Sequence, residues 1–287
     1  MIRGEGRRAM PHPAPNSEAD LSAYDYLQRL SPDRWAWEFL RRNPAFRCDA
    51  AARTDTDLSE RMAPCVPIRL VRSRAPQTFA ERWGLVFMPN PDRNGFDADV
   101  VWNRSAFPDQ VEVHCTPRAL DERCELWDRS IPICNITHIT DPVGREYLLV
   151  RRNDFVVQLC CTGLSLLGLE PVRMTLAISG VDDYERRVKL QKAAFEIYGD
   201  HTRRERPAWT KTTQVLRDGL IALDCIEHGM SRREIACVLH GRQRVEQDWD
   251  GPSLKHAIRY LVRKAEALRD GGYQKELLGA EPTVAGV

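Results

Sequence analysis

The stretch SRREIACVLHG, residues 231–241, decides how the C-terminal part of the chain folds. Its first and fourth residues, Ser231 and Glu234, form a capping box, in which the serine caps the helix and the glutamate reaches back. Apolar side chains follow at helical spacing, and Gly241 ends the run. We therefore predict a short capped helix, with the small side chain of Ala236 where another helix crosses it closely.

A longer helix is predicted immediately before this one, over residues 213–228. Four apolar side chains share one face of it, and Gly229 follows as glycine does just after a helix end. These four are Leu216, Leu220, Leu223 and Ile226. A helix, a tight turn and a short capped helix therefore come in the order typical of a helix-turn-helix module.

A third helix is predicted from Pro252 or Ser253, with a continuous inward stripe of apolar side chains. The stripe consists of Leu254, Ala257, Ile258, Leu261, Val262, Ala265 and Leu268.

The outward side of this third helix carries a cationic ridge. Lys255, Arg259 and Arg263 recur every four residues along it, and His256 and Lys264 flank them. Such a helix fits the DNA major groove, where arginine pairs bidentately with guanine. The alternative is an ordinary solvated face. The same hypothesis assigns DNA contacts to the neighbouring basic residues Arg232, Arg233, Arg242 and Arg244.

One feature departs from the usual helix-turn-helix. The segment 242–251 is ten residues long, whereas the usual turn has about three or four. It contains Trp249 and two of the arginines named above. Either an extra helical turn lies within it, or the third helix is set at an unusual angle.

The chain has 287 residues, a net charge of +1 and 43% hydrophobic residues, which is typical of a globular protein with about two domains. Residues 201–276 hold 15 Lys or Arg against 11 Asp or Glu, and the rest holds 27 against 30. The C-terminal part is thus mildly basic, a weak nucleic-acid signal. No apolar run approaches the length of a membrane span, so we expect no membrane partner, and the pattern of the cysteines predicts a cytoplasmic protein.

The nine cysteines show no C-x-x-C spacing, so we expect reduced thiols that are mostly buried. Cys134 and His138 have an i, i+4 spacing, with Cys115 and Cys124 upstream, and a zinc site there is the alternative. We expect no metal and no cofactor.

Ser31 and Pro32 predict the start of an N-terminal helix that ends by Asn43, because the following proline pushes Asn43 out of the α region. Trp35 and Phe39 are interpreted as core residues of this helix. The side chains away from that face are predicted to contact a protein partner: Trp37, Arg41 and Arg42.

Short β-prone runs, punctuated by turn residues, dominate residues 68–179. They lie at 68–71, 85–87, 111–113, 147–150, 155–161 and 172–178, with helices near 79–83 and 118–124. Helical spacing returns from a cap at Asp182 or Asp183 to about Tyr198. The predicted fold class is α+β: a small N-terminal helical segment, a mostly antiparallel β middle region and an all-helical C-terminal module.

These changes of pattern predict the organisation of the chain. They indicate a disordered tail over 1–19, an N-terminal domain over 20–117, a β-rich continuation over 118–180, a helical DNA-binding module over 181–279 and a tail over 280–287.

Two stretches resemble known families. The run WAWEFLRRNP at 35–44, with WGL at 83–85 and VW at 101–102, resembles a transcriptional-regulator-like domain of proteobacteria. Residues 231–278, with REIA, LHG, GGY, Arg259 and Arg263, resemble a second family of formerly unknown function. In this order, the two modules resemble the quorum-controlled activators of excision and conjugative transfer in proteobacterial integrative and conjugative elements.

The resemblance implies a variant helix-turn-helix, activation of excision or transfer promoters, and silencing by a small antiactivator protein. DNA contacts carry over only to Arg259 and Arg263. Double-stranded DNA is the expected main partner, RNA polymerase is a second protein partner to consider, and a homodimer is the ordinary prior for a bacterial regulator.

No phosphate-binding glycine loop occurs, and GLSLLG at 163–168 does not fit a nucleophile elbow. His138 with Asp141, and Glu112 with His114, are acid–base pairs for which the sequence places no third partner. We therefore expect a protein that is not an enzyme. Two alternatives stay open beside a DNA-binding activator: a module that sequesters a protein partner without binding DNA, and a small-molecule-sensing or catalytic β domain joined to a helical adaptor.

Overall fold

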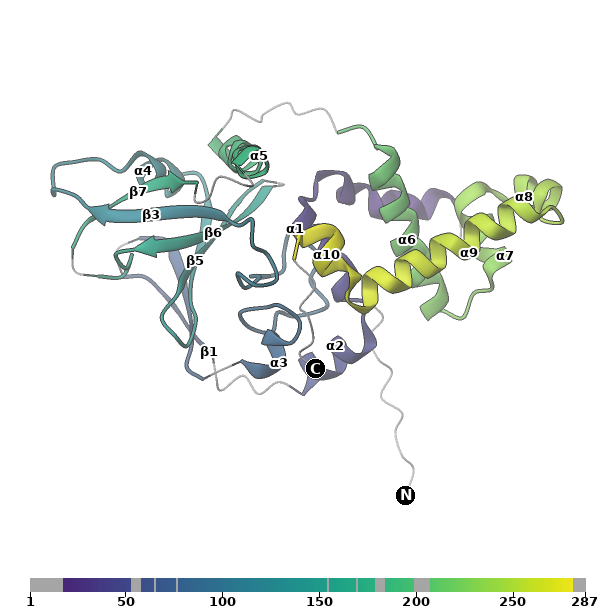
Figure 1. The fold of residues 1–287 in the computed structure, drawn as a ribbon, viewed down its shortest axis with the longest axis horizontal. Helices are drawn as coiled ribbons and strands as arrows, with labels where there is room; N and C mark the ends of the chain where they lie inside the picture. The colour runs from purple at the N-terminus through teal and green to yellow at the C-terminus, as the bar shows by residue number, and fades with distance from the viewer. Residues whose placement is uncertain are drawn as a thin grey trace, which may run out of the picture.

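The computed structural model describes residues 18–52, 58–64, 66–75, 77–153, 155–168, 170–178, 184–198 and 207–280. A sheet lies on one side of the molecule and most of the helices lie on the other (Figure 1). The predicted α+β class is confirmed, with N-terminal helices, a mostly antiparallel sheet in the middle and C-terminal helices. The predicted tails, almost entirely, and the cap at 182–183 lie outside the described residues, and the predicted domain boundaries stay predictions.

The sheet has seven strands: β1 (Leu58–Met62), β2 (Ile68–Ser73), β3 (Val111–Pro117), β4 (Asn135–Thr140), β5 (Glu146–Arg152), β6 (Phe155–Gly163) and β7 (Val172–Ala177). Their order across the sheet is β1-β2-β4-β5-β6-β3-β7. β2 runs parallel to β4 and β3 parallel to β6, whereas the other neighbouring pairs are antiparallel.

Both faces of the sheet are covered. Leu148 and Val150 of β5 point into one core, together with residues of α4 (Glu125–Ser130) and of η3 (Glu196–Tyr198), a short turn of helix that directly follows α5 (Tyr184–Phe195). Tyr147 and Leu149 point into the opposite core, which the segment 86–101 closes. Successive residues of β5 thus reach opposite faces, as strand geometry requires.

Several of these elements differ from the sequence-based predictions. β1 and β4 were not predicted; the central residues of β4, 136–139, are all buried, including Thr137 and His138, so no polar–apolar alternation marks this strand. The predicted strand at 85–87 makes only an isolated bridge from Leu85 to Trp102. The helix predicted at 118–124 begins only at Glu125, whereas α3 (Thr78–Glu81) lies close to its predicted place.

The remaining helices share one large core with the loop that precedes β3. They are η1 (Glu18–Arg29), α1 (Pro32–Leu40), α2 (Pro44–Ala51), α6 (Lys211–Glu227), α7 (Arg232–His240), α8 (Arg242–Asp248), α9 (Pro252–Ala267), η4 (Leu268–Gly272) and α10 (Tyr273–Leu278). The ring centroids of Trp102 and Tyr273 lie 5.6 Å apart in this core, and both side chains are fully buried. N-terminal and C-terminal helices therefore pack around one common core.

Both ends of α1 follow from local sequence. Ser31 precedes the helix as its N-cap and Pro32 is its first residue, as predicted. Asn43 not only follows the end of α1 but also caps the start of α2. Its Oδ1 accepts hydrogen bonds from the N–H groups of Ala45 (2.9 Å) and Phe46 (3.0 Å). Its Nδ2 donates to the carbonyl oxygen of Arg269 (3.1 Å), which ties this corner to η4.

Candidate nucleic-acid interface

The turn between α6 and α7 forms as the sequence predicts. Gly229 has φ +78°, a conformation that favours glycine after a helix end. Glu234 N–H donates to Ser231 Oγ (3.3 Å), and Ser231 N–H donates to Glu234 Oε2 (2.7 Å), which completes the capping box. The hydrogen bond from the Ser231 backbone holds the pKa of Glu234 below its usual value.

A single glycine separates α7 from α8. Gly241, with φ +82°, is both the C-cap of α7 and the N-cap of α8. The ten-residue segment 242–251 therefore contains a short helix, and the first of the two alternatives for it is correct. Val245 is fully buried and anchors α8, while Arg242 and Arg244 are exposed.

Helix α9 packs against α6 through its apolar side. Leu254, Ile258, Val262 and Ala265 are buried there, as predicted. A side chain at Gly219 of α6 would meet Ala265 Cβ at 3.2 Å, so the two helices cross closely at this point. The predicted stripe was wrong at Ala257, which is exposed because the buried face of α9 is narrower than the sequence pattern.

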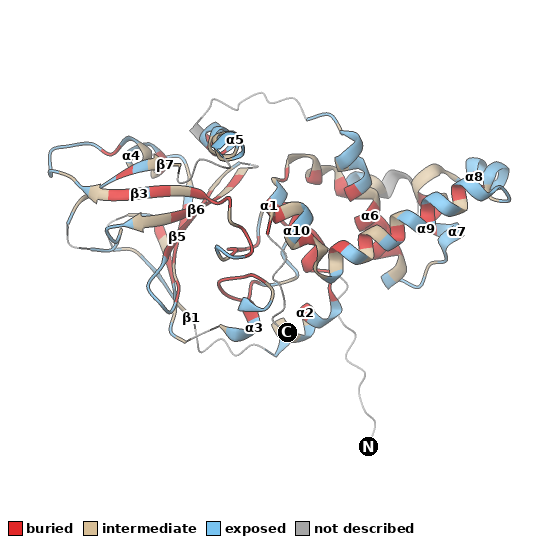
Figure 2. Cartoon of the chain, viewed as in Figure 1, coloured by how far each residue is buried: buried red, intermediate tan, exposed pale blue. Residues whose placement is uncertain are grey.

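The opposite side of α9 is a solvent-facing cationic surface. Arg259, Arg263 and His256 are exposed, and Lys255 is half-buried, with its ammonium group 5.8 Å from the centre of the Trp249 ring. Tyr260, which the sequence analysis did not single out, is 58% exposed on the same face. Figure 2 shows exposed residues along one side of α9 and buried residues along the other.

Charge distinguishes α9 from α8. From residue 252 to residue 263 the chain has three basic and no acidic side chains. In α8 and just after it, Glu246, Asp248 and Asp250 are exposed, and Asp248 lies 3.6 Å from Arg244 in an ion pair. Acidic side chains therefore offset the positive charge less on α9 than on α8.

The basic residues assigned to DNA contact are placed as follows. Arg232 and Arg233 are exposed on the first turn of α7, and Arg242 is exposed on the first turn of α8. Across the described ranges, no acidic side chain forms an ion pair with them or with Arg259 or Arg263. Lys264, in contrast, pairs with Glu276 at 3.4 Å.

The prediction of a partner-binding surface at Trp37, Arg41 and Arg42 needs correction. Their exposed fractions are 0%, 1% and 5%, because α1 is surrounded on all sides and not on one face only. Trp37 Nε1 donates to the carbonyl oxygen of Arg93 (3.0 Å). Trp35 and Phe39 are core residues, as interpreted.

Instead, the two arginines form a buried ionic network. Arg42 donates to both carboxylate oxygens of Asp224 in α6, at 2.7 and 2.9 Å, and Tyr24 Oη donates to Asp224 Oδ2 at 2.6 Å. Glu38 accepts hydrogen bonds from Arg41 (2.7 Å) and Arg42 (2.8 Å). Burial alone raises the pKa of Glu38, but the two guanidinium groups outweigh it and lower that pKa to about 2.

The residues considered for an acid–base pair or a zinc site have other neighbours in the structure. His138 Nε2 lies 3.4 Å from Glu146 Oε2, whereas Asp141 accepts a hydrogen bond from Arg145 Nε (2.6 Å). Cys115 and Cys124 are buried. Within the residues described by the structure, no three His, Cys, Asp or Glu side chains gather as a metal site.

Two family models match the chain. Residues 19–88 match a proteobacterial transcriptional regulator-like domain. Residues 173–278 match a domain described as "T6SS, Transcription factor, DNA binding domain". These matches support a DNA-binding transcription regulator. No curated protein matches the chain.

The two matched regions contain different elements of the structure. The second one contains α6 to α10, and thus the whole cationic surface of α9. The first one contains α1 and Arg42 just after it, and Arg42 bonds to Asp224 in the second. Both matched domains are described as regulatory or DNA-binding. Over the described residues, no helix has the length and apolar character needed to cross a bilayer.

Proposed function

We propose that the chain is a sequence-specific transcriptional activator that places α9 in the major groove of double-stranded DNA. The observation that carries this proposal is the exposed face of α9, which has three basic and no acidic side chains between residues 252 and 263. Its apolar opposite face is fixed against α6, so the basic side chains are presented on a rigid support. The α7–α8 unit, with Gly241 at its corner, makes this a variant helix-turn-helix.

The proposed DNA contacts divide by position. Arg259 and Arg263 meet base edges, because both are exposed on the acid-free stretch of α9 and neither forms an ion pair with an acidic side chain of the described residues. Lys255 and His256, on the turn before them, and Arg232, Arg233, Arg242 and Arg244 on the neighbouring helices contact phosphates, which position the protein without reading sequence.

The regulated genes are proposed to be those for excision or conjugative transfer of a mobile element. This part rests on the resemblance of the two modules taken together, and it includes silencing by a small antiactivator. The matched DNA-binding domain is described for a T6SS transcription factor, so promoters of such secretion genes are the competing targets. Sequencing the genomic fragments that the purified protein retains separates the two.

Binding to the DNA upstream of its own gene, measured by fluorescence anisotropy across a salt series, tests the proposal. If each of the five Lys and Arg side chains assigned to phosphates neutralises one phosphate, the affinity falls about 500-fold between roughly 50 and 200 mM salt. Scrambled DNA should compete poorly. A folded protein that binds no DNA at low salt would contradict the proposal.

One observation favours a second candidate, which is a surface for a protein partner. Tyr260 is a large, exposed aromatic residue on the face of α9, and aromatic side chains are typical anchors of protein interfaces. In that case Tyr260→Ser would abolish partner capture, and salt would change the affinity little. In the DNA-binding case, the arginine substitutions are the more damaging ones.

A further inference from the structure

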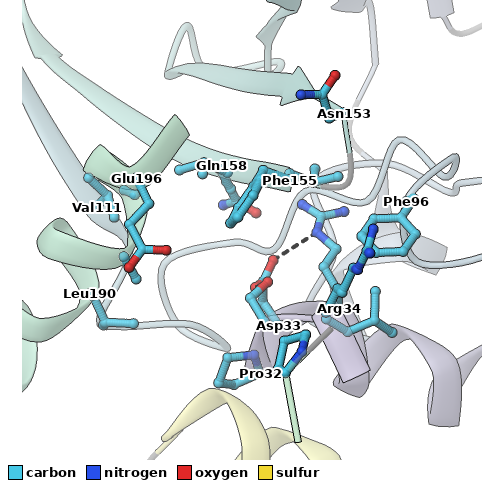
Figure 3. A pocket seen from close by; sticks show the side chains of 18 of the residues that line it. Pro32, Asp33, Arg34, Phe96, Val111, Asn153, Phe155, Gln158, Leu190 and Glu196 are labelled. Atoms are coloured by element: carbon cyan, nitrogen blue, oxygen red, sulfur yellow. Dashed lines mark hydrogen bonds and ion pairs between the residues drawn. The ribbon is translucent and has the colours of Figure 1, made fainter. Parts of the chain in front are cut away.

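A cavity of about 580 Å³ opens between the sheet and the helices, outside the surface assigned to DNA. Its walls come from the start of α1, from β6, from α5 and from the loop before β3 (Figure 3). The volume lies within the range of about 300–1,000 Å³ of small-molecule sites in proteins.

The walls are mainly apolar and partly aromatic. Phe96, Phe107 and Phe155 line the cavity, together with aliphatic residues such as Val111 and Leu190. Helix α5 is held in place as one wall, because Gln191 Nε2 donates to the carbonyl oxygen of Ala177 (2.6 Å). The cavity therefore offers a preformed place for an apolar ring or chain.

Two charged side chains at the base of the cavity each keep at least one buried atom without a hydrogen-bond partner, although Asp33 Oδ1 accepts a hydrogen bond from Ser31 Oγ (2.5 Å). Arg34 is 1% exposed and donates through Nη2 to the carbonyl oxygen of Val100 (3.1 Å), but its Nη1 has no partner. Asp33 is 6% exposed; its Oδ2 lies 2.9 Å from Arg34 Nε in an ion pair, without the geometry of a hydrogen bond. Figure 3 shows both side chains extending from α1 toward Phe155.

These open positions define the chemistry of a ligand. Leaving a buried donor and a buried acceptor unsatisfied costs free energy, so a ligand that satisfies both gains it. Arg34 Nη1 requires an acceptor, and Asp33 Oδ2 requires a donor. Four charged side chains line the cavity, and they carry no net charge together: Arg29, Arg34, Asp33 and Glu196. A ligand with a net charge would therefore be left uncompensated in an apolar setting.

We propose that this cavity binds a neutral small molecule with an aromatic body and a carboxamide head. The carbonyl oxygen of the head accepts from Arg34 Nη1, and its N–H group donates to Asp33 Oδ2, while the aromatic body fills the space between Phe96 and Phe155. The site does not depend on DNA binding, and its test does not use DNA.

The test uses the full chain and N-phenyl-1-naphthylamine, a neutral fluorescent probe that brightens in apolar surroundings. Saturable binding of one probe per chain is expected. 3-Phenylpropanamide should displace the probe at a concentration about tenfold lower than 3-phenylpropanoate, which has the same body and a charged head. A probe signal that does not saturate, or equal competition by amide and carboxylate, would overturn the proposal.

Substitutions on α5 place the binding in this cavity. Ala193 is exposed and lines the cavity, so Ala193→Trp should block probe binding without changing the melting temperature. Lys192, its exposed neighbour, does not line the cavity, and Lys192→Trp should bind like the unaltered protein. Undiminished binding by the folded Ala193→Trp variant would show that the probe lies elsewhere and would refute the site.

Discussion

Replacing Asp224 by alanine should destabilise the whole helical unit. The carboxylate is 1% exposed, and it accepts two hydrogen bonds from Arg42 and one from Tyr24. Its removal leaves the guanidinium of Arg42 buried, with Glu38 as its one remaining acidic partner among the residues that the structure describes. Removing one partner of a buried ion pair costs about 3–5 kcal/mol. At about 2–4 °C per kcal/mol for a chain of this size, the melting temperature should fall by about 10 °C.

The matched control is Asp218→Ala on the same helix. The Asp218 side chain is 23% exposed, and its ion pair within the described part of the chain is with the adjacent Arg217 (2.7 Å), so its loss should cost less than about 1 kcal/mol. Thermal unfolding followed by circular dichroism measures both variants. If the two variants melted within a degree of each other, the reasoning about the buried network would be refuted. A double variant, Arg42→Met with Asp224→Leu, should recover much of the loss, because it removes both charges together.

Three further predictions concern local structure and pH. Ser231→Ala should cost about 1 kcal/mol through the lost cap, whereas Ser253→Ala, at a position without a capping hydrogen bond, should melt like the parent. Gly241→Ala should cost about 1–3 kcal/mol, because φ +82° with ψ 146° is a conformation adopted almost only by glycine, and a urea titration that showed no change would contradict the assigned turn. The pKa of Glu38 is lowered to about 2 in the folded chain. The ionised carboxylate therefore contributes fully to the free energy of unfolding above the ordinary pKa of 4.5, and this contribution is lost as the pH falls toward 2. Unfolding free energies measured across that window should therefore fall less steeply with acid for Glu38→Gln, and equal slopes would count against the assigned ion pairs.

Local signals in the sequence were sufficient to predict α6, α7 and α9, but not η4 or α10. The capping box at Ser231 and the glycines at 229 and 241 act through backbone geometry within a few residues. They can therefore be recognised from a short stretch of sequence. The helix α8 was one of two alternatives, because seven residues with a single buried Val245 make a weak periodic signal.

The environment of α1 could not be predicted in the same way. A helical pattern assigns Trp37, Arg41 and Arg42 to the sides of the helix, but it does not show that other segments cover those sides. The acceptor of Arg42 lies 182 residues further along the chain, in α6. Burial of a charged side chain depends on such a distant partner, and a single sequence does not show the pairing.

The cavity is a second example of this limit. Asp33 and Arg34 occupy the first turn of a capped helix, where an acidic residue is ordinary. Their open hydrogen-bonding positions appear only when β6 and α5, more than a hundred residues away, close the space above them.

The measurement that tests the central claim most directly is DNA binding by the Arg259→Ala, Arg263→Ala double variant. Both side chains are exposed, so the variant should melt like the parent protein. Its control is Arg104→Ala, at a surface arginine that is 52% exposed and lies outside the C-terminal helices. The account predicts that each arginine contributes about 1–3 kcal/mol to operator binding, while the control binds as tightly as the parent. Equal affinity of the parent and the double variant would contradict the assignment of this face of α9 to DNA.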